Sequence, residues 1–176
     1  MSDLAAIRRN TVSVEFLSRE YRISCEVSIR DHPLMDTLND RQSQFISAEN
    51  VYISPIEDPT VFLAQRAQAV VRKDQITLAI LRREEDGYAR SVLHRNLRQV
   101  PIVYSMTVIL PGMEIRGGLK IASAAEADIV MAQGSDRFVA IYYGTATLID
   151  NHDMQFAGGA VLVNREHAQM LFVERK

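Results

Sequence analysis

Residues 12–29 of the chain read VSVEFLSREYRISCEVSI, and residues 104–121 read YSMTVILPGMEIRGGLKI. Both stretches alternate apolar and polar side chains with a period of two on each side of a short turn, which is typical of two antiparallel, half-buried strands. In the second stretch the turn is Pro111-Gly112, and this pair suits a type II turn because glycine tolerates the positive φ required there. The stretches lie 92 residues apart. We therefore expect one strand-rich unit to occur twice.

The correspondence continues beyond this hairpin in the same order and with nearly the same spacing. At an offset of 92 or 93 residues the matched pairs are Asp36 with Asp128, Leu38 with Val130, Phe45 with Phe138, Val71 with Val163 and Ile80 with Phe172. Few residues are identical, so an alternative is that two strand-rich segments align by chance. The ordered set of matches favours an internal duplication.

Each copy is expected to hold about five strands, which in the first copy fall at residues 11–17, 21–30, 45–54, 61–71 and 75–81. A five-stranded antiparallel sheet exposes its edges unless it curls into a small barrel or pairs with another sheet. The predicted fold class is therefore mainly β, with two tandem five-stranded small barrels or curled sheets packed through a shared apolar face. We expect a first module at 1–82, a linker at 83–99 and a second module at 100–176.

Short helical segments complete this prediction. One is expected at residues 3–9, and residues 34–39 form either one helical turn or a tight loop. In the linker, Tyr88, Val92 and Leu97 allow a short amphipathic helix, with a solvated connection as the alternative.

Composition favours a soluble protein without a polyanionic partner. The chain of 176 residues is 47% hydrophobic and 24% charged, close to the averages for globular proteins. It has no apolar run of the roughly 18 residues that a membrane span needs, and we expect it in the cytoplasm, where the single Cys25 stays reduced. The formal net charge is -2, neither half is basic, and only residues 82–99 lean positive. Nucleic-acid binding would therefore need a local basic patch.

No motif in the sequence indicates catalysis, a cofactor or a metal. Cys25 is in phase with the apolar positions of its strand, so it is expected in the core rather than as a nucleophile. The four histidines lie singly, without the spacing of a zinc site. Asp150 and Asp153 indicate a hairpin connection rather than a calcium loop, and the pairs Gly117-Gly118 and Gly158-Gly159 indicate bulges or close backbone approach. The sequence predicts no enzyme.

A family resemblance rests on the hairpin and on two further segments. The 12–29 hairpin followed by Asp36-Thr37-Leu38-Asn39 resembles the first motif of Sm-like proteins, and Leu110–Leu119 resembles that hairpin more closely. Val71-Arg72-Lys73 resembles the second Sm motif, with Lys73 in place of its glycine. The resemblance implies an SH3-like barrel fold. Residues 34–39 with Phe45-Ile46 are also similar to uncharacterised bacterial β-modules, which imply no activity.

The Sm-like resemblance also implies a candidate site for single-stranded RNA. In that family the loop Asn and the Arg of the second motif line a ring pore and hold uridine-rich RNA, and the matching positions are Asn39 and Arg72. Tyr52 is a third candidate contact, and Asp36 is expected to structure the loop. The alternative is that Asp36 and Asn39 cap a helical turn or satisfy loop amides, and that Arg72 is a solvated charge or an ion-pair partner. The second copy has Met131 and Asn164 at the two positions, so the site is expected in one copy only.

Three functional hypotheses follow from the sequence. The first is a non-enzymatic binding or assembly protein that pairs with itself in a homo-oligomer or with another protein, without a cofactor. The second is a single-stranded RNA-binding protein that uses Asn39, Arg72 and Tyr52. The third, an enzyme with a site at the seam between the copies, has no motif behind it.

Overall fold

A computed structural model describes residues 10–93, 102–121 and 134–174. Ten strands form one antiparallel sheet in the order β10-β6-β7-β8-β9-β5-β1-β2-β3-β4. The strands of the first half are β1 (Thr11–Leu17), β2 (Tyr21–Ser28), β3 (Phe45–Pro55), β4 (Ala64–Arg72) and β5 (Leu78–Leu81). Those of the second half are β6 (Ile102–Leu110), β7 (Met113–Ile121), β8 (Phe138–Leu148), β9 (Gln155–Asn164) and β10 (Met170–Glu174). The mainly β prediction is confirmed.

Short helices occupy the connections. Helix α1 (Leu34–Asn39) joins β2 to β3, and the 3-10 turns η1 (Lys73–Gln75) and η4 (Arg165–His167) precede β5 and β10. Between the halves lie η2 (Glu84–Gly87) and α2 (Arg90–Leu93). The helical alternative for residues 34–39 is therefore confirmed. The N-terminal helix expected at 3–9, and Leu97, Asp128, Val130 and Met131, lie outside the described residues.

The two halves pair their strands in the same order and register. Along the sheet, β5-β1-β2-β3-β4 in the first half matches β10-β6-β7-β8-β9 in the second. Val12 pairs with Val27, and 92 residues later Tyr104 pairs with Leu119. A register shift falls between Ser24 and Glu26 and recurs between Arg116 and Gly118. Backbone pairing thus repeats along the chain at the offset found in the sequence.

An unusual backbone conformation recurs at an offset of 93 residues. Asn50 has a φ of 50° and Tyr143 a φ of 51°. Residues other than glycine rarely adopt this left-handed region, so its occurrence at both bulges shows that each half bends its third strand at the same point.

The halves are joined through the main chain, because β5 pairs with β9 in one continuous sheet. The sequence predicted instead that they pack face to face through an apolar surface. The difference arises at residues 78–81, four consecutive apolar residues that are all buried. A strand with both faces buried belongs in the middle of a sheet rather than at its edge. Strand β5 is also shorter than expected, because Lys73–Gln75 form a 3-10 turn and the strand starts only at Leu78.

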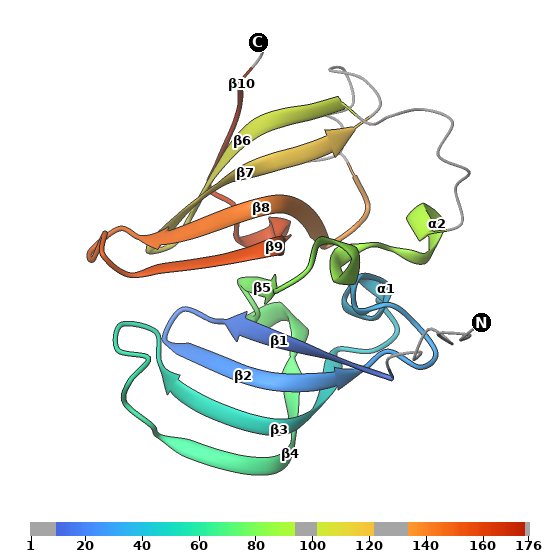
Figure 1. Cartoon of the computed structure of the whole chain (residues 1–176), viewed down its shortest axis with the longest axis vertical. Helices are drawn as coiled ribbons and strands as arrows, with labels where there is room; N and C mark the ends of the chain where they lie inside the picture. The colour runs from blue at the N-terminus through green and yellow to red at the C-terminus, as the bar shows by residue number, and fades with distance from the viewer. Residues whose placement is uncertain (1–9, 94–101, 122–133, 175–176) are drawn as a thin grey trace, which may run out of the picture.

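Two groups of strands, β6–β9 and β1–β4, lie on either side of β5 (Figure 1), and each has an apolar core. One core belongs mainly to β6–β9 and the other mainly to β1–β4 with α1. The sheet is open, and among the described strands β4 and β10 are the two that pair on one side only. No described helix is long and apolar enough to pass through a bilayer.

Candidate binding site

The junction between β5 and β9 sends side chains alternately into the two cores. Leu78 pairs with Val163 and Ile80 with Val161, and all four lie in the core of the second half. The intervening residues, Ala79 and Leu81, lie in the core of the first half. This alternation follows from the period of two along a strand. One short strand therefore completes both cores.

The first half supplies part of the second half's core. Leu17, Ile56, Leu78 and Ile80 are each at most 5% exposed, and they join a cluster that otherwise consists of residues from β6–β9. Burying four such side chains contributes on the order of 6 to 12 kcal/mol of apolar transfer free energy, before conformational entropy is counted. The second half is therefore closed by a strand and loops that come from outside its own sequence.

Glycines let the segment after β5 cross closely over β9. A Cβ at Gly159 would lie 2.6 Å from the backbone nitrogen of Glu84 and 2.8 Å from the carbonyl oxygen of Arg82. The Gly159 N–H also donates a hydrogen bond to that Arg82 oxygen, at 3.2 Å. Both neighbours are main-chain atoms that cannot rotate away, so a side chain would not fit. This confirms the close backbone approach predicted for Gly158-Gly159.

A carboxylate fixes the same crossing segment to the second half. Glu84 accepts hydrogen bonds from Lys120, Tyr143 and Tyr88, which lower the pKa of its carboxyl to about 2. Lys120 also lies 4.6 Å from the ring centroid of Tyr142, within reach of a cation–π interaction. The segment after β5 is thus held both by close packing and by this charged cluster.

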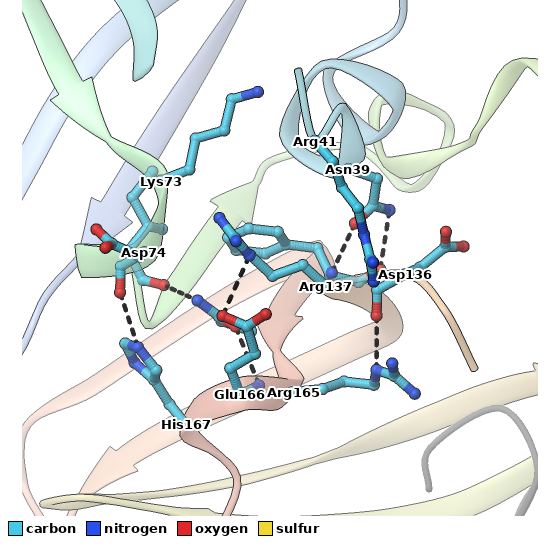
Figure 2. Close-up of polar contacts among 12 residues, drawn as sticks. Asn39, Arg41, Lys73, Asp74, Asp136, Arg137, Arg165, Glu166 and His167 are labelled. Carbon is cyan, nitrogen blue, oxygen red and sulfur yellow. Dashed lines mark hydrogen bonds and ion pairs between the residues drawn. The ribbon is translucent and has the colours of Figure 1, made fainter. Parts of the chain in front are cut away.

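A cluster of loop residues from both halves borders the junction, and Figure 2 shows its contacts. Arg165 donates to the carbonyl oxygens of Asp136, at 2.7 Å, and Gly134. Arg137 pairs with Glu166 at 3.2 Å. The buried Lys73 donates to the carbonyl oxygens of Thr37 and Asp40, and desolvation lowers the pKa of its ammonium. These contacts tie the loop before β5 to the loop before β3, and the loop before β10 to the loop before β8.

His167 joins the two halves within this cluster. Its Nε2 lies 2.8 Å from the carbonyl oxygen of Asp74, and its Nδ1 lies 3.2 Å from the hydroxyl of Thr77. Because a carbonyl can only accept, Nε2 carries the proton and Nδ1 accepts from Thr77. The turn η4 of the second half is thereby held on the segment that leads into β5.

The four residues singled out in the sequence have structural partners. Asn39 accepts from the Phe138 N–H at 2.7 Å and donates to the Phe138 carbonyl at 3.1 Å. Arg72 forms an ion pair with Asp74 at 2.8 Å. Asp36 accepts from the backbone N–H of Arg90 at 3.1 Å, which links α1 to α2. The Arg72 contact agrees with the ion-pair alternative, and the contacts of Asn39 and Asp36 agree with the alternative that they satisfy main-chain amides, whereas helix α1 has no side-chain cap.

Tyr52 lies apart from the other candidates. It is exposed on β3, its hydroxyl accepts from Gln65, and its ring centroid is 6.2 Å from that of Phe62. Arg72 pairs with Phe45 at the start of β3, seven residues before Tyr52 along that strand. At about 3.3 Å per residue this places Tyr52 roughly 20 Å from Arg72. The structure therefore does not gather Asn39, Arg72 and Tyr52 around one ligand.

Other candidates for chemistry are also accounted for. Cys25 is buried, as predicted, and burial raises the pKa of its thiol to about 12. Asp150 and Asp153 lie in the hairpin between β8 and β9, as predicted. Within residues 10–93, 102–121 and 134–174, no three His, Cys, Asp or Glu side chains lie close enough to hold a metal ion.

A pocket opens beside β4, at the free end of the first half. It has a volume of about 330 Å³, and its apolar lining includes Phe16, Tyr21, Ile23, Val71 and Ile76. Leu17 lines it too, and its polar part consists of Ser18, Arg19, Glu20 and Gln75. We call this pocket together with the unpaired side of β4 the β4 edge site.

In the second half the position that corresponds to the β4 edge site is filled. The residues 92 positions after Phe16, Tyr21, Ile23 and Val71 are Val108, Met113, Ile115 and Val163. All four are buried in the core that Leu78 and Ile80 of β5 complete. The first half thus has an open pocket where the second half has a docked strand.

Sequence reasoning missed the β4 edge site, although a signal for it was present. Residues 160–163 of β9 read AVLV, and the corresponding residues 68–71 of β4 read QAVV. Apart from Gln68, which corresponds to Ala160, both strands have apolar residues at these positions, but those of β9 are buried and Val70 is exposed. A duplicated pattern with one copy covered and the other open points to a docking surface.

Comparison with models of known protein families, with curated proteins and with solved structures gives no match to this chain.

Proposed function

We propose that this protein is a non-enzymatic docking protein, built from a duplicated five-stranded module, that binds an apolar β-strand at the β4 edge site. The observation that carries the proposal is the junction itself. In the second half, the corresponding edge and core receive β5, whose residues Leu78 and Ile80 become fully or almost fully buried. The first half repeats that receiving surface and leaves it open.

Strand addition fits the chemistry of this surface. Strand β4 has nine residues and pairs with β3 on one side, so its other side presents main-chain N–H and C=O groups. Main-chain hydrogen bonds to such an edge supply affinity, and a pocket for alternate side chains supplies specificity. The pocket beside β4 has the apolar lining that this mode requires.

RNA binding, the alternative implied by the Sm-like resemblance, has less support. The amide of Asn39 is engaged with the Phe138 main chain, and Arg72 is paired with Asp74. The formal charge of -2 also disfavours a polyanion. Titration of labelled oligouridine at several salt concentrations tests this alternative, because phosphate contacts make affinity fall steeply as salt rises. Salt-dependent binding that is lost in Asn39→Ala and Arg72→Ala would favour it over strand docking.

A peptide of residues 76–83, ITLAILRR, is the direct probe of strand docking, because it contains β5 and ends in two arginines that aid solubility. Labelled with fluorescein, it should bind the chain with saturable anisotropy. Val70→Arg should weaken this binding at least about tenfold, since it places a charge where a docked strand excludes water. Val70 is 68% exposed, so the substitution should leave the fold intact.

The matched control is Val103→Arg, the same substitution at a valine that is also exposed and lies outside the segment of β6 paired with β10. It should bind the peptide like the wild type. Equal peptide affinity in Val70→Arg and Val103→Arg would overturn the proposal.

A further inference from the structure

The strands at the two edges of the sheet correspond to the two strands that pair at its centre. Inside the chain β9 pairs with β5, and the strands at the two ends are β4 and β10 (Figure 1). At the offset of 92 residues β4 is the counterpart of β9, and β10 is the counterpart of β5. The two edges of the sheet, β4 and β10, are therefore the counterparts of the two strands, β9 and β5, that pair at its centre.

We propose that the strand bound at the β4 edge site is β10 of a second copy of this chain. This inference rests on the proposed function and names its partner. The junction between copies repeats the internal one, so the interface is head to tail, with β4 of one chain against β10 of the next. A heterologous contact of this kind continues from chain to chain and produces a closed ring or a filament.

The internal junction specifies the register of the contact. Leu78 pairs with Val163, Ala79 with Leu162, Ile80 with Val161 and Leu81 with Ala160. Moving the β5 residues forward and the β9 residues back by 92 positions gives the pairs between chains. They are Met170 with Val71, Leu171 with Val70, Phe172 with Ala69 and Val173 with Gln68.

Exposure of the apolar side chains supports this partner. Met170 is 59% exposed and Phe172 is 51% exposed, whereas their counterparts Leu78 and Ile80 are buried. Ile149 is exposed as well, and its counterpart Ile56, 93 residues earlier, is buried in the second half's core. Leu78 and Ile80 of β5, and Ile56 of the β3–β4 connection, thus fill the second half's core, and their equivalents in the second half are exposed apolar residues.

These side chains point the right way for the pocket. Leu171 and Val173 pack against the core of their own half, as Ala79 and Leu81 do in the first half. Because successive side chains alternate between the faces of a strand, Met170 and Phe172 face outward. In the derived register they enter the pocket beside β4.

The exposed residue on β4 is used by the same contact. Val70 corresponds to Leu162, which is fully buried across the internal junction. In the derived register Val70 lies opposite Leu171 and is covered by the second copy. Each strand therefore buries exposed apolar surface of the other. A strand from an unrelated protein would match these positions only by chance.

The polar contact of His167 at the internal junction also has counterpart residues at the proposed junction between chains. His167 bonds to the Asp74 carbonyl and the Thr77 hydroxyl. Its counterpart in the first half is Gln75, an amide that lines the pocket. In the assembled form Gln75 lies by Glu166 and Gln169 of the second copy, where an amide has both a donor and an acceptor to offer.

The experiment combines a measurement of mass with a cross-link that reports register. Light scattering coupled to size exclusion should show the wild type above the 19.9 kDa of one chain. Phe172→Asp and Val70→Arg should each shift the protein to the mass of one chain, whereas Val103→Arg should not. Because Phe172 and Val70 are exposed in the single chain, the two variants should still fold, and far-UV circular dichroism checks this.

The register is tested by the double variant Ala69→Cys, Phe172→Cys. Under mild oxidation it should form disulfide-linked dimers and higher species, because directly opposed residues on antiparallel strands bring Cβ atoms within bonding range. The matched control Gln65→Cys, Phe172→Cys moves one cysteine four residues along β4 and should not cross-link. The native Cys25 is buried, and its raised pKa keeps it from competing.

The outcomes separate this inference from the proposed function. The peptide of residues 76–83 is titrated into Phe172→Asp, whose β4 edge site is intact. Peptide binding together with a wild type that stays a single chain overturns the second copy as partner and leaves strand docking standing. An oligomer that survives Val70→Arg, or that cross-links equally in the control, also overturns this interface. No peptide binding to Phe172→Asp overturns the proposed function and this inference together.

Discussion

Truncation of Leu78 to alanine tests whether β5 completes the second half's core. Leu78 is completely buried and lies in that core although it belongs to the first half. Leu78→Ala removes three carbon atoms, which at about 0.8 kcal/mol per methylene corresponds to about 2.4 kcal/mol of transfer free energy. A cavity in a packed core adds to this, so the expected loss of unfolding free energy is about 3 to 4 kcal/mol.

The matched control is Met170→Ala, the corresponding position 92 residues later. Met170 is exposed in the single chain, so its truncation should change the unfolding free energy by less than about 0.5 kcal/mol. Both substitutions are made in the Val70→Arg background, in which we expect a single chain, so that assembly does not contribute to the measured stability.

Urea unfolding followed by far-UV circular dichroism measures the difference, since the chain has no tryptophan to serve as a fluorescence probe. With an m-value of about 2 to 3 kcal/mol per molar urea, Leu78→Ala should lower the midpoint by roughly 1 to 2 M. The transition should stay single, because neighbouring residues of β5 lie in both cores. A loss below about 1 kcal/mol for Leu78→Ala, or an equal loss for Met170→Ala, would refute the view that β5 is the strand that closes the second half.

Two further predictions concern polar contacts. Asn39→Ala should lower the unfolding free energy by about 1 to 3 kcal/mol, because it leaves the Phe138 N–H and carbonyl without their partner, and an unchanged urea midpoint would count against this structural role. Glu84→Gln should destabilise the protein by on the order of 1 kcal/mol at neutral pH, with Glu114→Gln as a control at an exposed ion pair. The folded pKa of Glu84, about 2, lies below its ordinary value, so the stabilisation is present above about pH 4.5 and is lost as the pH falls toward 2. Unfolding curves from pH 7 to pH 2.5 should therefore show the wild type and Glu84→Gln converging, and a constant difference across that range would contradict the assignment.

Local patterns were sufficient to predict the elements of this fold. The period of two placed β1, β2, β6 and β7 almost to the residue, and Pro111-Gly112 gave the turn between the last two. Gly112 has a φ of 78°, as a type II turn requires at that position. These features depend on residues that are near one another in sequence, so a single chain contains the information for them.

Contacts between the halves could not be predicted in the same way. Asn39 was singled out as a polar loop residue, but the main chain that satisfies it belongs to Phe138, 99 residues away. Strand β5 was expected as the closing strand of its own half, and its pairing with β9 depends on which edge the second half offers. Asn39 and Arg72 were singled out by resemblance to the RNA-binding motifs of a family. Such motifs carry no information about the contacts that these residues make within this chain.

The sequence does contain one clue to the junction. Residues 78–81 are uninterrupted apolar residues, and so are residues 170–173 of β10. A run without alternation indicates burial on both faces and hence a central strand. Strand β5 is buried on both faces within the chain, whereas β10 alternates exposed with half-buried positions. The apolar run of β10 thus has the pattern of a central strand, which we propose it becomes between chains.

Period-two alternation also makes edge pairing selective. Strand β4 has Gln65, Arg66, Gln68 and Arg72 along its exposed edge, and charged or polar side chains at an edge discourage indiscriminate pairing. A slip of one residue between β4 and β10 would place Phe172 and Met170 on the face of β4 away from the pocket, while Leu171 and Val173 stay in their own core because β10 pairs with β6. The register inherited from the internal junction brings Met170 and Phe172 to the pocket face. The proposed interface is thus open in the single chain and still selects the register of the strand that it binds. A repeating assembly needs this selectivity in order to add each chain in the same alignment.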